Sequence, residues 1–351
     1  MEVRMFGHKH YVPVLRWKQA ERLALKELNN NYRFHMTPLI ELPPTKFGSF
    51  DQDVLRKAVK DIRDCWGNAP IYIDLHLLPS PIWGQTLALV HETAENLEVC
   101  IIPVTRLTKS DNYQRVVAGI LKRKDNGVCV RIKIKEMRNT AFEKDLKRML
   151  SILAISPKET HLIIDYEIMT ENAVSLRELC NRLPRLNEWL TFSIISGVFP
   201  RDLTEIKPPG QHLIRRLDWL TYLQEIRDTA GLPRIPSFGD YTIQHPIYYE
   251  PPKRSNYSAS IRYTTNDAWL IMRGEAVFHP NSPGFSQYPA NAQLLCARQE
   301  FCGPDFSAGD RYIYEMGQQL IRTGNARTWL TAGINHHLSF LAHQISNLTW
   351  S

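Results

Sequence analysis

Charged and ionisable side chains interrupt four short apolar segments of the sequence at alternating positions. In one segment Asp74 and His76 alternate with isoleucine and leucine, and in another Arg131 and Lys133 alternate with valine and isoleucine. Because successive side chains of a β-strand point to opposite faces, the polar residues of each segment should share a face. Seven residues belong to this pattern: Glu41, Asp74, His76, Arg131, Lys133, Asp165 and Glu167.

This mixture of acids, bases and cations suits acid–base chemistry on an anionic substrate. Carboxylates and histidines transfer protons, and the predicted catalytic residues are Glu41, Asp74, His76, Asp165 and Glu167. Guanidinium and ammonium groups bind phosphate and carboxylate groups. The predicted substrate-binding residues, some of them at segment ends and some in the last third of the chain, are Lys18, Arg106, Arg131, Lys133, Asp240, Arg262 and Arg273.

Two other interpretations of these charges stay open. The cations can neutralise the carboxylates in a salt-bridge network that fills the interior of the fold, since ion-pair networks also occur without catalysis. Magnesium or manganese would suit the carboxylate oxygens, although Arg131 and Lys133 would compete with the metal. The sequence leaves the metal and any cofactor undetermined.

The segments that carry these residues belong to a repeating strand-and-helix pattern. Short apolar segments are each followed by a stretch with helical periodicity, and their starts recur about every 25–35 residues until the last, longer interval, which is typical of a barrel of β/α units. The predicted strands span residues 11–17, 36–42, 70–78, 98–107, 127–135, 160–168, 190–199 and 235–241, with a helix predicted over 212–226. Eight units without a glycine-rich phosphate-binding loop favour a closed (β/α)8 TIM-type barrel over an open doubly wound sheet.

The pattern changes after residue 241. Residues 1–242 should form the barrel core, and residues 243–326 a long insertion after the eighth strand that covers the C-terminal mouth, where barrel active sites lie. Residues 327–351 should supply a C-terminal helix that packs on the barrel. Its adjacent histidines, His336 and His337, should point about 100° apart, so that one packs and the other is solvated.

A hairpin is predicted within the insertion, over residues 257–264 and 268–274. Basic and aromatic residues interleave along it and just before it: Lys253, Arg254, Tyr257, Arg262, Tyr263, Trp269 and Arg273. Such a composition can stack bases and bind phosphates, or form an ordinary amphipathic hairpin.

Composition narrows the class of protein. The six cysteines lack CxxC spacing and the N-terminal residues lack the apolar run of a signal peptide, which favours the cytoplasm. No apolar stretch approaches the about 20 residues that cross a bilayer, so no membrane association is expected. The formal net charge of +7 favours an anionic partner, either a small molecule or a nucleic acid. Walker A, nucleophile-elbow and HExxH motifs are absent from the sequence.

Several short motifs together resemble the beta family proteins of phages and bacteria. They are YVPVLRWK at 11–18, LIELPP at 39–44, FGDY at 238–241, SIRYT at 260–264, WLIMRG at 269–274, SAGDRYIYE at 307–315 and WLTAGINHH at 329–337. The resemblance spans nearly the whole chain and implies an accessory role near mobile elements, including phage defence with a partner protein from a defence operon. It implies no particular reaction, because the family has no settled biochemical activity.

Two functions of different classes therefore remain. One is an enzyme that acts on a phosphate-bearing or nucleotide-like substrate at the barrel mouth. The other is a non-catalytic binding module that recognises a phage protein or a nucleic acid. An open pocket lined by the interior charges would favour the enzyme, and an interior filled by paired charges would favour the binding module.

Overall fold

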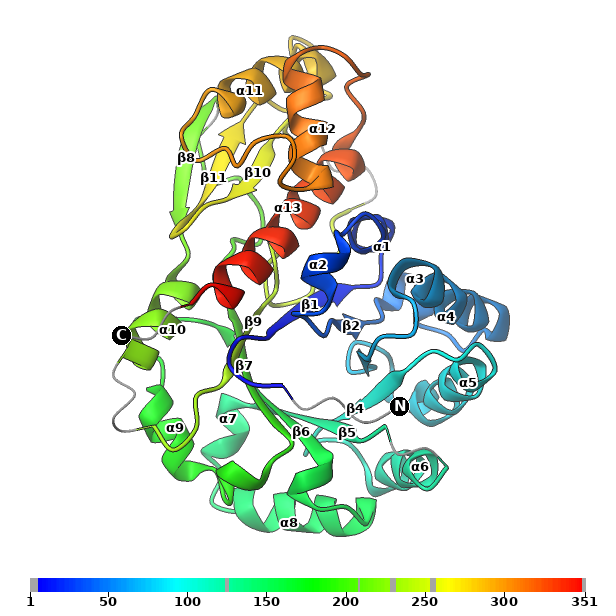
Figure 1. Ribbon diagram of the computed structural model, residues 1–351. Helices are drawn as coiled ribbons and strands as arrows, with labels where there is room; N and C mark the ends of the chain where they lie inside the picture. Colours follow the sequence, from blue (N-terminus) through cyan, green and yellow to red (C-terminus); the bar gives the residue numbers. More distant parts are fainter. Residues whose placement is uncertain (1–5, 124–125, 208, 228–231, 253–256, 349–351) are drawn as a thin grey trace.

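The computed structural model describes residues 6–123, 126–207, 209–227, 232–252 and 257–348. In this part of the chain eight parallel strands close into a barrel in the order β1-β2-β3-β4-β5-β6-β7-β9 (Figure 1). They are β1 Tyr11–Arg16, β2 Leu39–Glu41, β3 Ile71–Asp74, β4 Ile101–Thr105, β5 Val128–Lys133, β6 Thr160–Ile168, β7 Thr191–Gly197 and β9 Ser237–Asp240. The predicted (β/α)8 barrel, with every barrel strand before residue 242, is confirmed.

Helices surround the barrel, and the longer ones each present one apolar stripe to it. In α4 (Gln52–Trp66), Asp51 caps the start by accepting a hydrogen bond from the backbone N–H of Asp53 at 3.0 Å, and Leu55, Val59 and Ile62 are buried. The other barrel helices are α1 Gln19–Lys26, α2 Asn30–Arg33, α3 Pro44–Phe47, α5 Trp83–Asn96, α6 Asp111–Leu121, α7 Ile134–Met137, α8 Phe142–Leu153, α9 Leu176–Arg182 and α10 Leu217–Arg227.

Alternation along the strands sorts the apolar side chains into an outer and an inner group. Ile71 and Ile73 pack outward among the helices, whereas Tyr72 between them packs inside the barrel. The buried members of the inner group are Val12, Val14, Leu39, Tyr72, Ile102, Val104, Cys129, Ile163, Ile195 and Tyr241. The strand faces predicted from the sequence for β3, β5 and β6 are therefore confirmed.

A second, three-stranded sheet with its two helices forms what we call the lobe. Its strands lie in the order β10 (Ile261–Thr264), β11 (Ala268–Arg273) and β8 (Gly210–Arg215), and all pairings are antiparallel. The hairpin predicted from the sequence corresponds to β10 and β11. The helix predicted over 212–226 is wrong at its start, because residues 210–215 form β8 and α10 begins at Leu217.

The lobe is built from chain on both sides of the last barrel strand, since β8 precedes β9 while β10 and β11 follow it. Helices α11 (Gln287–Cys296) and α12 (Ala308–Gly317) pack with the sheet around a second apolar core. In Figure 1 the lobe lies beside the barrel, near α1. Helix α13 (Ala326–Ser346) runs between them and contacts both α1 and β10.

Two adjacent histidines of α13 tie the lobe to the barrel. His337 places Nε2 2.9 Å from Oδ2 of Asp240 in β9 and Nδ1 2.8 Å from the Thr264 hydroxyl. His336 places Nδ1 2.9 Å from Oδ2 of Asp310 in α12 and Nε2 2.8 Å from the Thr264 carbonyl oxygen. Both rings contact Thr264 of β10, and their other contacts diverge to β9 for His337 and α12 for His336. The expectation that one of them is solvated is wrong, because α13 is enclosed between barrel and lobe and both rings are buried.

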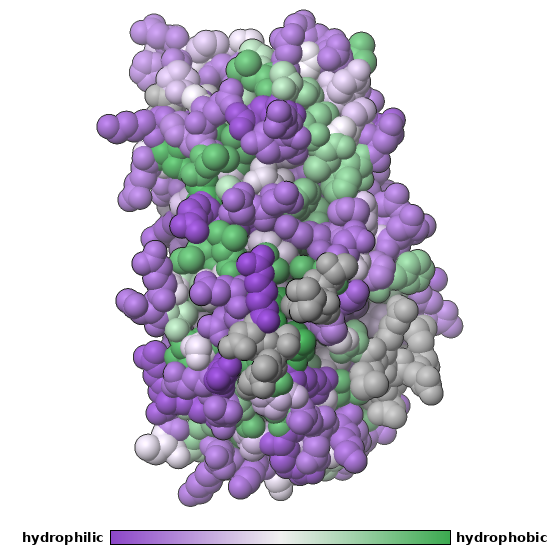
Figure 2. All heavy atoms as spheres, turned by 60° about the vertical axis from the view of Figure 1, so that its left-hand side comes forward, coloured by the Kyte–Doolittle hydropathy of each residue, from purple (hydrophilic) through white to green (hydrophobic). Residues whose placement is uncertain are grey.

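The face drawn in Figure 2 is mainly hydrophilic. Figure 2 shows purple side chains over most of one face, with green patches that are more extensive in the upper half, which is the lobe. Among the described residues, none of the helices combines the length and apolar character needed to cross a membrane.

Candidate functional site

Arg131 of β5 lies at the centre of the charged interior. Its Nε and Nη2 donate to Oδ2 of Asp165 in β6 at 3.0 and 2.7 Å, and its Nη1 donates to Glu41 in β2 at 2.8 Å and to Asp74 in β3 at 3.0 Å. Nη2 also donates to the hydroxyl of Tyr241 at 2.7 Å. The four charged side chains are at most 2% exposed. One guanidinium thus holds three buried carboxylates together.

Two further arginines balance the charge. Arg106, just after β4, donates to Asp74 at 2.6 and 3.1 Å, and Nε of Arg16 at the end of β1 lies 3.8 Å from Glu41. We call this set the interior charge cluster: Arg16, Glu41, Asp74, Arg106, Arg131, Asp165 and Tyr241.

The cluster keeps its carboxylates ionised. Burial disfavours their charged forms, but the neighbouring cations outweigh it. Arg106, with His76 and Arg131, holds the pKa of Asp74 well below its usual range. For Asp165 burial is likewise outweighed, mainly by Arg131, and its pKa is lowered. At neutral pH these groups are therefore negative and cannot donate protons.

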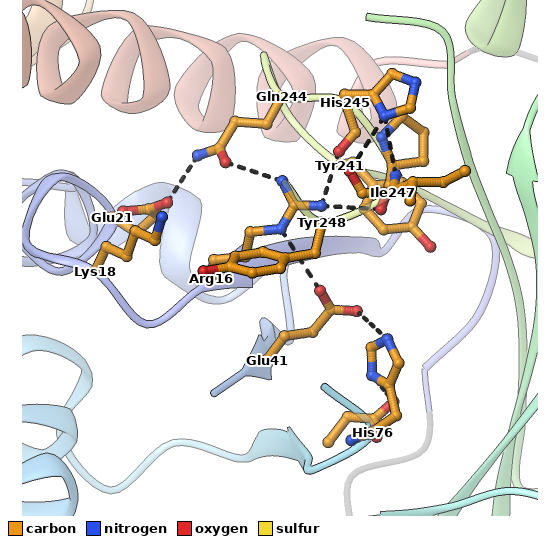
Figure 3. Close-up of polar contacts among 12 residues, drawn as sticks. Arg16, Lys18, Glu21, Glu41, His76, Tyr241, Gln244, His245, Ile247 and Tyr248 are labelled. Atoms are coloured by element: carbon orange, nitrogen blue, oxygen red, sulfur yellow. Dashed lines mark hydrogen bonds and ion pairs between the residues drawn. The ribbon is translucent and has the colours of Figure 1, made fainter. Parts of the chain in front are cut away.

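His76 lies where the cluster meets the mouth of the barrel. Its Nδ1 is 3.3 Å from Oδ2 of Asp74. Its Nε2 is 3.6 Å from Oε1 of Glu41, and this contact is seen at the lower right of Figure 3. Its backbone N–H donates to Asp74 at 2.9 Å. The His76 side chain is 20% exposed. His76 is thus a partly exposed imidazole beside two buried carboxylates.

A second charged pair stands at the mouth. Nζ of Lys133 lies 2.5 Å from Oε1 of Glu167, and these side chains are 21% and 29% exposed. The strand register shifts between Asp165 and Ile168, and Glu167 has a φ of 57°. This irregularity redirects the end of β6 and brings Glu167 out of the buried layer.

The segment over residues 244–250, which we call the mouth strap, covers Arg16. Nη2 of Arg16 donates to the carbonyl oxygens of His245 and Pro246 at 2.8 and 2.9 Å, and Nη1 donates to Oε1 of Gln244 at 3.2 Å (Figure 3). The part of the predicted insertion that contacts the interior charge cluster is thus its beginning, directly after β9.

A cavity of about 380 Å³ lies beside the mouth strap at the ends of β6 and β7. It has the size of a small-ligand site. Its lining residues are Ile168, Val198, Phe199, Pro200, Arg201, Asp202, Thr204, Glu205, His245 and Pro246.

Lys18 and Asp240 do not join the interior charge cluster. Lys18 pairs with Glu250 of the mouth strap at 2.6 Å, where both side chains are more than a third exposed. Asp240 points away from the interior and accepts a hydrogen bond from Tyr11 at 2.5 Å. The reason is strand alternation, because Gly239 takes the interior position of β9.

Arg262 and Arg273 belong to the lobe and also lie apart from the cluster. Arg262 donates to the carbonyl oxygen of Ile243 at 2.9 Å, and Arg273 donates to Ser260 at 3.3 Å. The aromatic residues between them, Tyr263 and Trp269, are buried and so are not exposed to stack bases. Lys253 and Arg254 lie outside the described residues.

Neither Tyr241 nor Lys109 was predicted from the sequence as a residue of the site. Tyr241 donates to both carboxylate oxygens of Asp165 at 2.9 Å, and its signal was present, because it continues the alternation from Gly239. Lys109, in the loop after β4, is buried with Nζ 3.0 Å from the centre of the Trp83 ring. Burial lowers its pKa to about 7. Loop residues carry no alternation that could have revealed it.

A metal is compatible with three residues of the site only if Arg131 moves. Glu41, Asp74 and His76 offer ligand atoms within 4.8 Å of one another. However, Nη1 of Arg131 lies 2.8 Å from Oε1 of Glu41 and 3.0 Å from Oδ2 of Asp74. A divalent cation would need the position that this guanidinium holds.

Comparisons with known proteins place the chain in a family. Among solved structures it is similar to a crystal structure of D-psicose 3-epimerase with D-tagatose from Clostridium cellulolyticum, at 8% identity over 66% of this chain and 84% of that chain, with a TM-score of 0.31. No curated protein matches the chain. The model of the Beta protein family matches residues 11–343, and the chain therefore belongs to the Beta protein family.

Proposed function

We propose that the chain is a cytoplasmic enzyme that acts on an anionic, phosphate-bearing or nucleotide-like substrate at the C-terminal mouth of the barrel. The observation that carries the proposal is the position of His76, a partly exposed imidazole 3.3 and 3.6 Å from two ionised carboxylates. A carboxylate beside an imidazole holds the ring in one orientation, and this arrangement serves general acid–base catalysis.

Each charged residue then has a distinct role. His76 exchanges a proton with the substrate, and Asp74 and Glu41 orient it. Asp165 is a positioning residue, because it acts through Arg131. Glu167, 29% exposed, is a second proton-exchanging group at the mouth. The negative charge of the substrate is met by Lys133 and Lys135 and by Arg201 of the neighbouring cavity, and the first two also face Glu167.

A different observation favours a non-catalytic binding module. The carboxylates of the interior charge cluster are already paired with arginines, so a structural network would account for them without any reaction. In that case a phage protein or a nucleic acid binds on the surface, in the phage-defence context that the family resemblance implies.

The two functions are separated by replacing His76 and assaying activity. Purified protein is incubated with nucleoside mono-, di- and triphosphates and sugar phosphates, and product formation is followed. We expect turnover of at least one compound class, its loss in His76→Asn, and an unchanged Tm, because the imidazole is partly exposed. His279→Asn, at an exposed site in the lobe, is the matched control and should retain activity.

Turnover retained in His76→Asn would contradict the assigned role. If the native protein turns over none of these compounds but binds single-stranded or double-stranded nucleic acid, with or without His76, the binding module is the correct function.

A further inference from the structure

We infer a second ligand site at the N-terminal end of the barrel, which takes a neutral planar nitrogen heterocycle of the nucleobase type. A cavity of about 1140 Å³ opens there, opposite the mouth. Its lining includes the residues that immediately precede β1, β3, β4, β5, β6 and β7, namely His10, Pro70, Cys100, Gly127, Glu159 and Leu190. Its volume is ample for a heterocycle with an attached sugar.

The site is separate from the mouth. Apolar side chains fill the middle of the barrel, among them Val14, Leu39, Val104 and Ile163. The interior charge cluster lies on one side of this apolar layer, and the cavity lies on the other. The inference therefore does not depend on the proposed reaction.

His161 supplies an unused polar atom at the inner end of the cavity. The side chain lines the cavity and is buried, and its Nδ1 lies 2.9 Å from the hydroxyl of Thr191. Nε2 is also buried and has no hydrogen-bond partner among the described residues. A buried polar nitrogen without a partner costs stability. A ligand that hydrogen-bonds to Nε2 would recover that loss.

The charge state of His161 restricts the ligand. Burial lowers the pKa of this imidazole to about 3, so the ring is neutral at physiological pH. The nearby guanidinium of Arg33 is engaged, because it donates to the carbonyl oxygens of Leu25 and Leu28 at 2.8 and 3.3 Å. The inner part of the cavity thus offers a neutral hydrogen-bonding group, which suits an uncharged ligand better than an anion.

Aromatic rings make up much of the wall. Phe6 stacks on His10 with ring centres 3.9 Å apart, and it lies parallel to His161 at 6.1 Å. Tyr72 meets His161 edge-on at 5.3 Å, and Trp66 also lines the cavity. Flat aromatic walls favour a flat ligand, since base-on-ring stacking is strong and tolerant of the base. Stacking together with one hydrogen bond describes a nucleobase-like ring.

The test uses the full chain labelled with ¹⁵N-histidine, with adenosine and cytidine as probes and toluene as the apolar comparison. We expect at least one nucleoside to shift the side-chain resonance of His161 and to bind with a measurable heat. In His161→Phe the affinity should fall about tenfold, as for loss of one buried hydrogen bond. The ligand-free variant should melt no lower than the native protein.

His279→Asn, at an exposed site in the lobe, is the control and should bind the nucleoside unchanged. The inference is overturned if neither nucleoside shifts the His161 resonance at millimolar concentration, if His161→Phe binds as tightly as the native protein, or if toluene alone binds. Should His161→Phe fail to fold, the resonance shift in the native protein decides.

Discussion

Removing the guanidinium of Arg131 tests whether the interior charge cluster holds the barrel together. Arg131→Met keeps much of the side-chain volume and deletes all five hydrogen bonds to Asp165, Glu41, Asp74 and Tyr241. Asp74 retains Arg106, and Glu41 retains Arg16 at 3.8 Å. Asp165 loses its ion-pair partner and keeps the hydroxyl of Tyr241 and a backbone N–H.

The expected loss in free energy of unfolding comes from leaving the buried carboxylate of Asp165 without an ion-pair partner. Deleting one partner of a buried ion pair typically costs about 3–5 kcal/mol. With an unfolding entropy of about 2.1 cal/mol/K per residue, the 351 residues correspond to about 0.7 kcal/mol/K, so Tm should fall by about 4–7 °C.

The stability lost in Arg131→Met should be larger at neutral pH than in acid. In the native protein the lowered pKa of Asp165 stabilises the fold above its unfolded value, and this stability is lost as the pH falls. In Arg131→Met, burial without the cation raises the pKa of Asp165. The buried carboxylate therefore lowers the stability of the variant at neutral pH, and its protonation in acid removes this loss. The difference in Tm between the native protein and Arg131→Met should therefore be largest near about pH 7 and decrease towards about pH 4.

Thermal unfolding followed by circular dichroism measures both quantities. Arg185→Met is the matched control, because Arg185 forms a surface pair with Glu188, and its Tm should equal that of the native protein. A variant at Arg131 that melts within 1 °C of the native protein, or whose deficit does not shrink in acid, would refute the structural role of the cluster.

Two further outcomes are expected. Gly239→Ala should destabilise the barrel by about 1–3 kcal/mol in denaturant titration, because its Cβ would lie 2.4 Å from the carbonyl oxygen of Val12. Gly119→Ala, with open space on helix α6, should be neutral or stabilising. Equal effects of the two substitutions would contradict the packing argument. Burial, with Asp240 adding to it, raises the pKa of Asp218 to about 7, so this carboxyl costs stability as the pH rises from about 4 to about 7. Asp218→Asn should melt higher than the native protein at pH 8 and equally at pH 4, and an unchanged pH profile would show that the group does not titrate in the folded protein.

Strand alternation made most of the charged interior predictable. Once β3, β5 and β6 were identified, the parity of Ile71, Tyr72 and Asp74 was enough to place the carboxylates and Arg131 on the inside. Asp240 was grouped with them because it ends a barrel strand. Because Gly239 takes the interior position of β9, strand alternation points Asp240 outward to α13. The same alternation from Gly239 places Tyr241 on the inside, so it could have been predicted.

The lobe was only partly predictable, because its sheet depends on contacts that are distant in sequence. Residues 210–215 lead directly into helix α10, and an apolar pattern of this length does not distinguish a strand from a helix. What makes them a strand is pairing with β11, in which Leu213 faces Leu270 in register. Alternation grouped His76 with Asp74, but β3 ends at Asp74, so the distances from His76 to the two carboxylates depend on the geometry of the following turn, which the sequence pattern does not encode.

The last barrel strand, β9, lies in the sequence between strands of the lobe, and this order affects how the chain folds as it is synthesised. Strand β1 is made first, but its partner across the last gap of the barrel arrives more than two hundred residues later, as the pairing of Tyr11 with Phe238 shows. Until then one edge of the nascent sheet has no partner, and exposed edges are sites of aggregation. Closure is itself secured late, since Asp240 meets His337 only when α13 has emerged. Products truncated before β9 should therefore leave the edge of β1 without its partner, those truncated before α13 should lack the contact between Asp240 and His337, and both should depend on chaperones to stay unaggregated.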